Sequence, residues 1–194
     1  MNNLLQLPPL SLYIHYPWCL KKCPYCDFNS HDSEVQDGYI KALLKDLDED
    51  LKYVQQREIS SIFIGGGTPS LMNVKEVNDL FIGLNDRLDF ASNIEITLEA
   101  NPGTFEVDRF AEYRNAGINR LSIGVQSFND KQLKFLGRIH SASEAQNAII
   151  EAQNVGFENL NIDLMYGLKG QSIDECMNDI TTAITLNPSH ISFY

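Results

Sequence analysis

Three cysteines near the N-terminus have a spacing that suits one inorganic cofactor. Cys19, Cys23 and Cys26 form a CxxxCxxC pattern, and a loop of this length can turn three thiolates toward one point. Three thiolates on a four-iron cube leave one iron without a protein ligand, whereas the four cysteines of a usual ferredoxin close the cluster. The open iron could then coordinate a small molecule. The alternative is a Cys₃His zinc site that uses His15 or His31 as its fourth ligand.

A glycine-rich run, Gly65–Pro69, follows the second apolar stretch of the chain. Glycines let the backbone approach a ligand closely and adopt conformations that other residues avoid. The run lacks the Gly-Lys-Ser/Thr ending of a phosphate-binding P-loop. Taken alone, it is more simply interpreted as an ordinary turn, since most glycine-rich turns bind no ligand.

Single polar residues interrupt or close three other apolar stretches, at Glu99, Gln126 and Asp163. A buried carboxylate or amide needs a partner, and a satisfied core or rim group would explain each of them singly. Together they favour a site, because chemistry in βα barrels gathers at the carboxyl ends of the strands. Three other candidates are interpreted as structural residues: His140, His190 and Cys176.

The elements that would position these residues are repeated βα units. Strands are expected at 11–17, 60–64, 95–99, 120–125, 159–165 and 190–194, and helices at 35–56, 74–89, 106–116, 143–155 and 172–186. Such repeats predict a parallel sheet with right-handed crossovers. An open doubly wound sheet and a curved partial barrel share this pattern, and periodicity does not choose between them.

Helix ends are marked in the sequence as well. Ser172 is expected to cap the last helix, with Glu175 three residues later as its capping-box partner. Gly117 and Gly156 stand where the C-terminal caps of two other helices are expected.

Length and charge limit the class of protein. A chain of 194 residues with 43% hydrophobic residues suits one globular domain, and its net charge of −11 disfavours electrostatic binding of nucleic acid. The sequence shows neither a membrane span nor a secretory signal, and closely spaced cysteines indicate a reducing compartment, so we expect a cytoplasmic protein. The sixth apolar run ends at Tyr194 with no helix to cover it, which predicts a truncated protein.

The cysteine pattern and its neighbours carry a resemblance to a known family. The strings Tyr13–Cys19 and Cys23–Asn29 resemble the radical S-adenosylmethionine (SAM) superfamily, in the branch that contains anaerobic coproporphyrinogen III dehydrogenases and the heme chaperones called HemW. The resemblance runs from about residue 9 to Tyr194. It implies an α/β fold, a partial (β/α)6 radical SAM barrel truncated at the sixth strand, with residues 1–194 as a single core domain and the C-terminal part of the family's chain absent.

The same resemblance implies the cofactors and their residues. The three cysteines would bind a [4Fe–4S] cluster whose open iron takes the amino and carboxylate groups of SAM, which the family cleaves to methionine and a 5′-deoxyadenosyl radical. Arg138 would offer a planar cation to a carboxylate. The glycine run would cradle the methionine part of SAM. The positions that match the family's SAM pocket are Tyr13, Tyr25, Gly66, Gly67, Thr68, Glu99, Gln126, Arg138 and Asp163.

Phe28 separates the two halves of that branch. The dehydrogenases carry a further cysteine two residues after the third, and here that position is Phe28. The resemblance is therefore to a heme chaperone, which binds heme and delivers it to an acceptor protein that the sequence does not identify, and no catalytic residue is assigned. Oxidative decarboxylation of coproporphyrinogen III is the alternative activity. A zinc-stabilised α/β binding module without radical chemistry is the alternative of another class.

Overall fold

The computed structural model describes residues 7–103 and 107–194, which form one six-stranded sheet flanked by helices. The strands are β1 (Leu10–Tyr16), β2 (Ile59–Gly66), β3 (Phe90–Ala100), β4 (Arg120–Gln126), β5 (Asn159–Leu164) and β6 (His190–Phe193). The helices are α1 (Tyr39–Val54), a 3₁₀ turn η1 (Pro69–Leu71), α2 (Val74–Asn85), α4 (Phe110–Asn115), α5 (Asp130–Phe135), α6 (Ala142–Asn154) and α7 (Ile173–Thr185). Among the described residues, no helix is long and apolar enough to cross a membrane.

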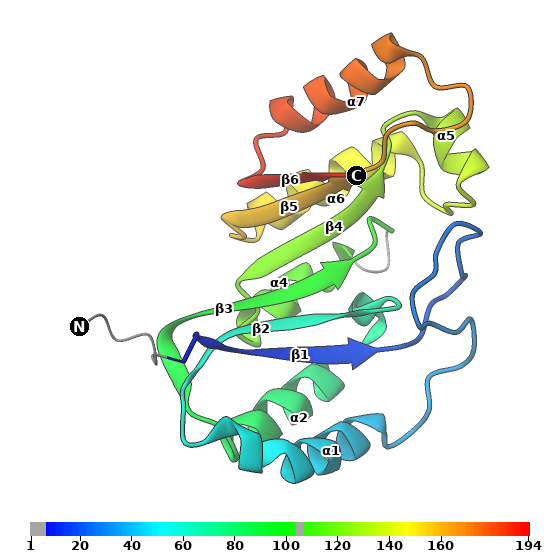
Figure 1. The fold of residues 1–194 in the computed structure, drawn as a ribbon. Coiled ribbons are helices and arrows are strands. Elements are labelled where there is room, and N and C mark those ends of the chain that lie inside the picture. The colour runs from blue at the N-terminus through cyan, green and yellow to red at the C-terminus, as the bar shows by residue number, and fades with distance from the viewer. Residues whose placement is uncertain (1–6, 104–106) are drawn as a thin grey trace.

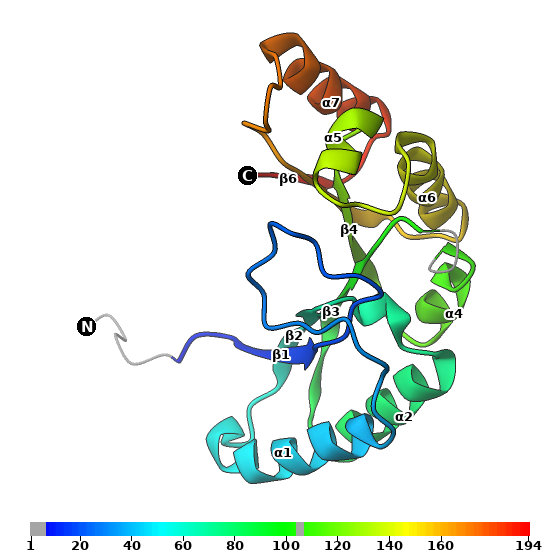
Figure 2. The same ribbon diagram turned by 90° about the vertical axis from the view of Figure 1, so that its right-hand side faces the viewer.

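The strand order decides between the two architectures that the sequence left open. The order is β1-β2-β3-β4-β5-β6, and every neighbouring pair is parallel. A doubly wound sheet reverses its order at a switch point, whereas right-handed crossovers without a reversal put every connecting helix on the same face. Figure 2 shows these helices as an arc around one side of the curved sheet. The fold is therefore the predicted open partial barrel, with β1 and β6 at its edges (Figure 1).

The two faces of the sheet differ in chemistry. On the helix side, Ile162 and Leu164 of β5 are fully buried in the hydrophobic core. On the opposite, concave side, Asn161 donates hydrogen bonds to Asp163 and to Ser122 of β4, each at 2.8 Å. Closed βα barrels fill this interior with branched aliphatic side chains. The polar concave face is therefore suited to a ligand rather than to close apolar packing.

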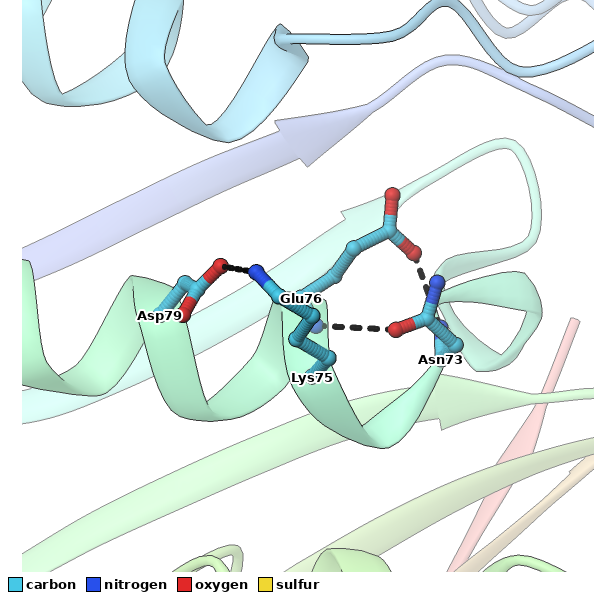
Figure 3. Close-up of polar contacts among 4 residues, drawn as sticks. All are labelled: Asn73, Lys75, Glu76 and Asp79. Atoms are coloured by element: carbon cyan, nitrogen blue, oxygen red, sulfur yellow. Dashed lines mark hydrogen bonds and ion pairs between the residues drawn. The ribbon is translucent and has the colours of Figure 1, made fainter.

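Three helices begin with the same reciprocal cap. At α2 the Asn73 side chain accepts from the Glu76 backbone N–H at 3.0 Å, and the Glu76 carboxylate accepts from the Asn73 N–H at 2.8 Å (Figure 3). Figure 3 also shows the ion pair of Lys75 with Asp79, one helical turn apart and exposed. Capping boxes of this kind also open α6 and α7, and the one at α7 is the pair predicted from the sequence, Ser172 and Glu175.

Glycines end three helices in the left-handed conformation. Gly117 and Gly156 follow α4 and α6 with φ of 108° and 93°, as predicted. Gly137 ends α5 in the same way, with φ 74°, and hydrogen bonds from Gly137 N–H to Lys134 O and from Arg138 N–H to Leu133 O complete a Schellman motif. The sequence did not predict α5, because its six residues are too short to show a helical period.

The helix and strand limits differ from the sequence predictions at several points. The helix expected over 35–56 begins only at Tyr39, because Gly38 takes φ 81° and residues 35–38 bury no side chain. The helix expected over 74–89 ends at Asn85, although Leu88 beyond it packs in the core. The helix expected over 106–116 spans Phe110–Asn115, and residue 106 lies outside the described residues. Strand β3 is longer than expected and begins at Phe90.

Candidate functional site

The cysteines lie on a loop that leaves the carboxyl end of β1 and is tied back upon itself. The Cys19 N–H donates to His31 O at 2.9 Å, and the His31 N–H donates to Pro17 O at 2.7 Å. Within the loop, the Cys26 N–H donates to Cys23 O at 3.0 Å, which makes a tight turn between two of the cysteines. These bonds hold the CxxxCxxC segment as a closed excursion, and its three thiols are free and partly exposed.

A cavity of about 490 Å³ opens beside this loop at the carboxyl ends of the strands. The cysteine loop forms one wall, and the ends of β2, β3, β4 and β5 form the others. All residues predicted for the site line this cavity except Tyr13 and Gly66. The predicted residues that line it are Cys19, Cys23, Cys26, Tyr25, Gly67, Thr68, Glu99, Gln126, Arg138 and Asp163.

Tyr13 and Gly66 lie outside the cavity lining. Tyr13 is 58% exposed, stacks on Phe63 with ring centroids 6.2 Å apart, and its hydroxyl forms a 3.0 Å hydrogen bond with His15 Nδ1. Gly66 has φ 123°, and its N–H donates to the Glu99 carboxylate at 3.1 Å. Gly66 is therefore hydrogen-bonded to a residue of the cavity lining, whereas Tyr13 contacts Phe63 and His15, which are not part of that lining.

Gly67 has a packing reason to lack a side chain. A Cβ at this position would stand 2.5 Å from the carbonyl oxygen of Trp18, closer than real Cβ atoms come to backbone. The Gly67 N–H donates to Tyr16 O, and the Thr68 N–H donates to Trp18 O, each at 2.7 Å. The glycine run thus lets the end of β2 lie directly against the start of the cysteine loop.

Two carboxylates face the cavity with perturbed acidity. Burial raises the pKa of Glu99 to about 7, against the opposing effect of the Gly66 N–H, and nearby Asp163 raises it further. Burial also raises the pKa of Asp163, while hydrogen bonds from Asn161 and Ser122 oppose that rise. Perturbed carboxyl groups in a cleft are typical of binding and catalytic sites.

Arg138 is one of the cations that line the cavity, and the Schellman turn after α5 places it there. Its Nη2 donates to Asn101 Oδ1 at 2.6 Å and to Gly124 O at 2.8 Å, and its Nη1 lies 3.5 Å from Cys23 Sγ. The buried Nε of Arg138 has no hydrogen-bond partner among the described residues. This donor is therefore available to an acceptor on a bound ligand.

Sequence reasoning missed two residues that complete the site. Asn101 accepts from Arg138 and donates through Nδ2 to Thr68 Oγ1 at 3.1 Å, so it joins the ends of β2 and β3 to the turn after α5. The Tyr194 hydroxyl donates to Gln126 Oε1 at 2.6 Å. Both follow strand ends, which was the available signal, but only the tertiary contacts show what they hold.

The other histidines make structural contacts. His140 is 5% exposed and its Nε2 forms a 3.1 Å hydrogen bond with Val125 O, and burial together with Arg138 lowers its pKa to about 4. His190 Nδ1 lies 2.6 Å from Asn161 Oδ1. Cys176 lies on α7 and is not part of the cavity lining.

The three cysteines of the predicted cluster site line one cavity together. Within residues 7–103 and 107–194, no three His, Cys, Asp or Glu side chains are arranged to hold one metal ion. A four-iron cluster places each thiolate on a different iron and so needs sulfurs that are farther apart. Both ring nitrogens of His15, a possible zinc ligand, are already hydrogen-bonded, to the Tyr13 hydroxyl and to Asn29 O.

The fold and the cavity define a class of protein: an open parallel α/β barrel with a cofactor site at the carboxyl ends of its strands. The profile of the radical SAM superfamily matches residues 13–183 of the chain. The chain therefore belongs to the radical SAM superfamily. Membership implies a [4Fe–4S] cluster and SAM as cofactors.

Individual relatives agree with this assignment. The chain is 55% identical to the heme chaperone HemW of Escherichia coli over 98% of its own length and 51% of that protein's. It is 37% identical to HemW of Bacillus subtilis, over 95% of the chain and 49% of that protein. The solved structure of coproporphyrinogen III oxidase (HemN) from Escherichia coli superposes with a TM-score of 0.80 at 31% identity, covering 96% of this chain and 44% of that one. The chain thus spans about half the length of the curated relatives it matches.

Proposed function

We propose that this chain is the cluster- and SAM-binding core domain of a HemW-like heme chaperone, with residues 1–194 acting as one domain. The observation that carries the proposal is the cavity wall itself, where Phe28 stands beside the three cysteines. Phe28 is 63% exposed and occupies the position where the related dehydrogenases have a further thiol. The identity of 55% to a protein named heme chaperone HemW supports the same choice.

In this proposal Cys19, Cys23 and Cys26 hold the cluster. The fit rests on three thiols that line one cavity and on Arg138, whose guanidinium lies 3.5 Å from the Cys23 sulfur. When bound, the cluster supplies one-electron chemistry to SAM. The protein's own part is to hold the cysteine loop closed and to leave one side of the cluster site facing the cavity.

The same cavity is the proposed SAM site. The free Nε of Arg138 can donate to the SAM carboxylate, and Gly67 and Thr68 flank the cysteine loop where the methionine part would lie. Glu99, Gln126 and Asp163 supply acceptors and an amide from three successive strands. Tyr25 contributes an aromatic wall. Gly66 and Tyr13 lie outside the cavity lining. The Gly66 N–H donates to the Glu99 carboxylate, and the Tyr13 hydroxyl is hydrogen-bonded to His15.

Heme or a related porphyrin is the proposed cargo, and an acceptor protein, not identified by these residues, is the proposed recipient. We place this function in the cytoplasm, because three unpaired cysteines in one loop suit a reducing compartment. The runner-up function is oxidative decarboxylation of coproporphyrinogen III, which the likeness to HemN favours.

The cluster assignment is tested by single cysteine substitutions. Replacing Cys19, Cys23 or Cys26 by Ala should abolish cluster assembly on anaerobic reconstitution with iron and sulfide, measured as the broad absorbance near ~400 nm and about four irons per chain. Cys176→Ala, on α7, is the matched control and should assemble the cluster. A Cys23→Ala protein that still binds about four irons would contradict the assignment. Stoichiometric zinc without sulfide would favour the zinc module.

The choice between chaperone and dehydrogenase needs the full-length protein. Reconstituted with SAM and a reductant, it should bind heme and produce no protoporphyrinogen from coproporphyrinogen III. Heme binding is followed by absorbance titration, and porphyrin carboxyl number by chromatography over many turnovers. Multiple-turnover decarboxylation without stoichiometric heme binding would contradict the chaperone proposal and favour the dehydrogenase.

A further inference from the structure

Gln126 occupies an unusual position at the end of β4. Its φ is 71°, in the left-handed region that residues other than glycine rarely adopt. The pairing of β4 with β5 slips just before it: Ile123 pairs with Ile162, and the next pair is Gln126 with Leu164. Three steps along β4 therefore match two along β5, which is the count of a β-bulge.

The irregularity determines where the Gln126 side chain points. Leu164, its partner in the register, faces the helix side and is fully buried. The Gln126 side chain instead lines the cavity, where its Oε1 accepts from the Tyr194 hydroxyl at 2.6 Å. Bulges near binding sites commonly re-aim a side chain in this way. A backbone in this strained region persists only when its surroundings hold it.

The Gln126 carbonyl accepts from the Met165 N–H at 2.9 Å, and the residues that follow Gln126 are held by a carboxylate on α7. Asp179 is 1% exposed, and its Oδ2 accepts from the Ser127 hydroxyl at 2.7 Å while its Oδ1 accepts from the Phe128 N–H at 2.8 Å. These are the two residues that follow Gln126. The Ser127 hydroxyl in turn accepts from the Asn129 N–H at 3.1 Å. One buried carboxylate therefore fixes the backbone immediately after the left-handed residue.

We propose that Asp179 is a positioning residue that holds Gln126 in its left-handed conformation, so that the Gln126 amide faces bound SAM. The inference deepens the proposed function and rests on it. Asp179 is not part of the cavity lining and reaches the cavity through the segment 127–128, to which it is hydrogen-bonded. Burial of a charge is unfavourable without such partners, and both carboxylate oxygens of Asp179 have one here.

A double-mutant cycle tests the proposal on the full-length, cluster-loaded protein. The probe is SAM, and the readout is its dissociation constant by calorimetry. Asp179→Asn keeps the shape but changes one acceptor into a donor, and we expect SAM affinity to fall by about tenfold, the effect of one lost charge-assisted hydrogen bond. Gln126→Ala should weaken SAM at least as much. Asp174→Asn, exposed in the first turn of the same helix, is the matched control and should bind SAM normally.

The double variant distinguishes positioning from mere stabilisation. If Asp179 acts through Gln126, then Asp179→Asn added to Gln126→Ala should weaken SAM no further. The inference would be overturned if the two substitutions together weakened SAM binding by the product of their separate factors, or if Asp179→Asn bound SAM normally. Either result would leave the proposed function intact. If Asp179→Asn does not fold, Ser127→Ala removes one of the same bonds and takes its place in the cycle. Failure of the unaltered protein to bind SAM would overturn both the proposed function and this inference.

Discussion

Glu99 offers the sharpest test of the site's electrostatics. Its carboxylate is partly buried at the end of β3, and this burial together with nearby Asp163 raises its pKa from 4.5 to about 7, against the opposing hydrogen bond from the Gly66 N–H. Glu99→Gln keeps the size and the acceptor oxygen but removes the charge. The variant should therefore be more stable than the unaltered protein wherever Glu99 must be ionised.

The magnitude follows from the pKa. In the unfolded chain Glu99 ionises near pH 4.5, and in the folded protein it ionises near pH 7. Below pH 4.5 Glu99 is protonated in both states and therefore does not lower the free energy of unfolding relative to the variant. As the pH rises from 4.5 through 7, the unaltered protein loses free energy of unfolding, because Glu99 ionises more readily in the unfolded chain. Each pKa unit corresponds to ~1.4 kcal/mol, so this rise in pKa lowers the free energy of unfolding at high pH by about 3 kcal/mol. For a chain of this length, that is roughly 6–12 °C in Tm.

The assay is urea or thermal unfolding of both proteins, without SAM, at several pH values from 4 to 9. The difference in free energy of unfolding between the variant and the unaltered protein should be near zero at the acid end. It should grow between about pH 4.5 and 7 and stay constant at higher pH. Glu95→Gln is the control, since Glu95 lies on the same strand but is exposed. The reasoning would be refuted if the difference in free energy of unfolding did not change with pH, or if the unaltered protein became more stable relative to the variant as the pH rose.

Two further substitutions test the framework of the cavity. Asn101→Ala removes the contacts to Arg138 Nη2 and Thr68 Oγ1, so SAM affinity should fall by about tenfold or more in a calorimetric titration. Gly67→Ala would bring a Cβ to 2.5 Å from Trp18 O, so the free energy of unfolding should fall by about 1–3 kcal/mol, measured by urea denaturation.

Each of these predictions has a control elsewhere in the chain. Asn93→Ala, exposed on β3, should leave SAM affinity unchanged, and equal losses at Asn93 and Asn101 would argue against a specific role for Asn101. Gly117 has φ 108°, but a Cβ added there would meet no atom of the described residues within 4 Å, so Gly117→Ala measures backbone strain alone. A Gly67→Ala protein as stable as the unaltered one would show that the cysteine loop does not pack as described.

The sequence by itself determined the βα repeat, three of the helix ends and the polar residues at the strand ends. These follow from local rules: apolar runs and helical stripes set the strands and helices, Ser172 with Glu175 sets a cap, and parallel strands bring their carboxyl ends to one edge. The residues that follow those ends, such as Glu99 and Asp163, therefore had to meet, and the structure places both in one cavity.

The tertiary structure alone decided the rest. The barrel rather than the doubly wound sheet depends on strand order, which periodicity does not encode. Helix α5 has only six residues, too few to show a repeating helical pattern, yet the turn that ends it places Arg138. Asn101 and Asp179 act through partners 37 and 52 positions away in the chain, Arg138 and Ser127. Residues so far apart in the chain meet only when the strands and helices pack together, so no local pattern could have predicted these contacts.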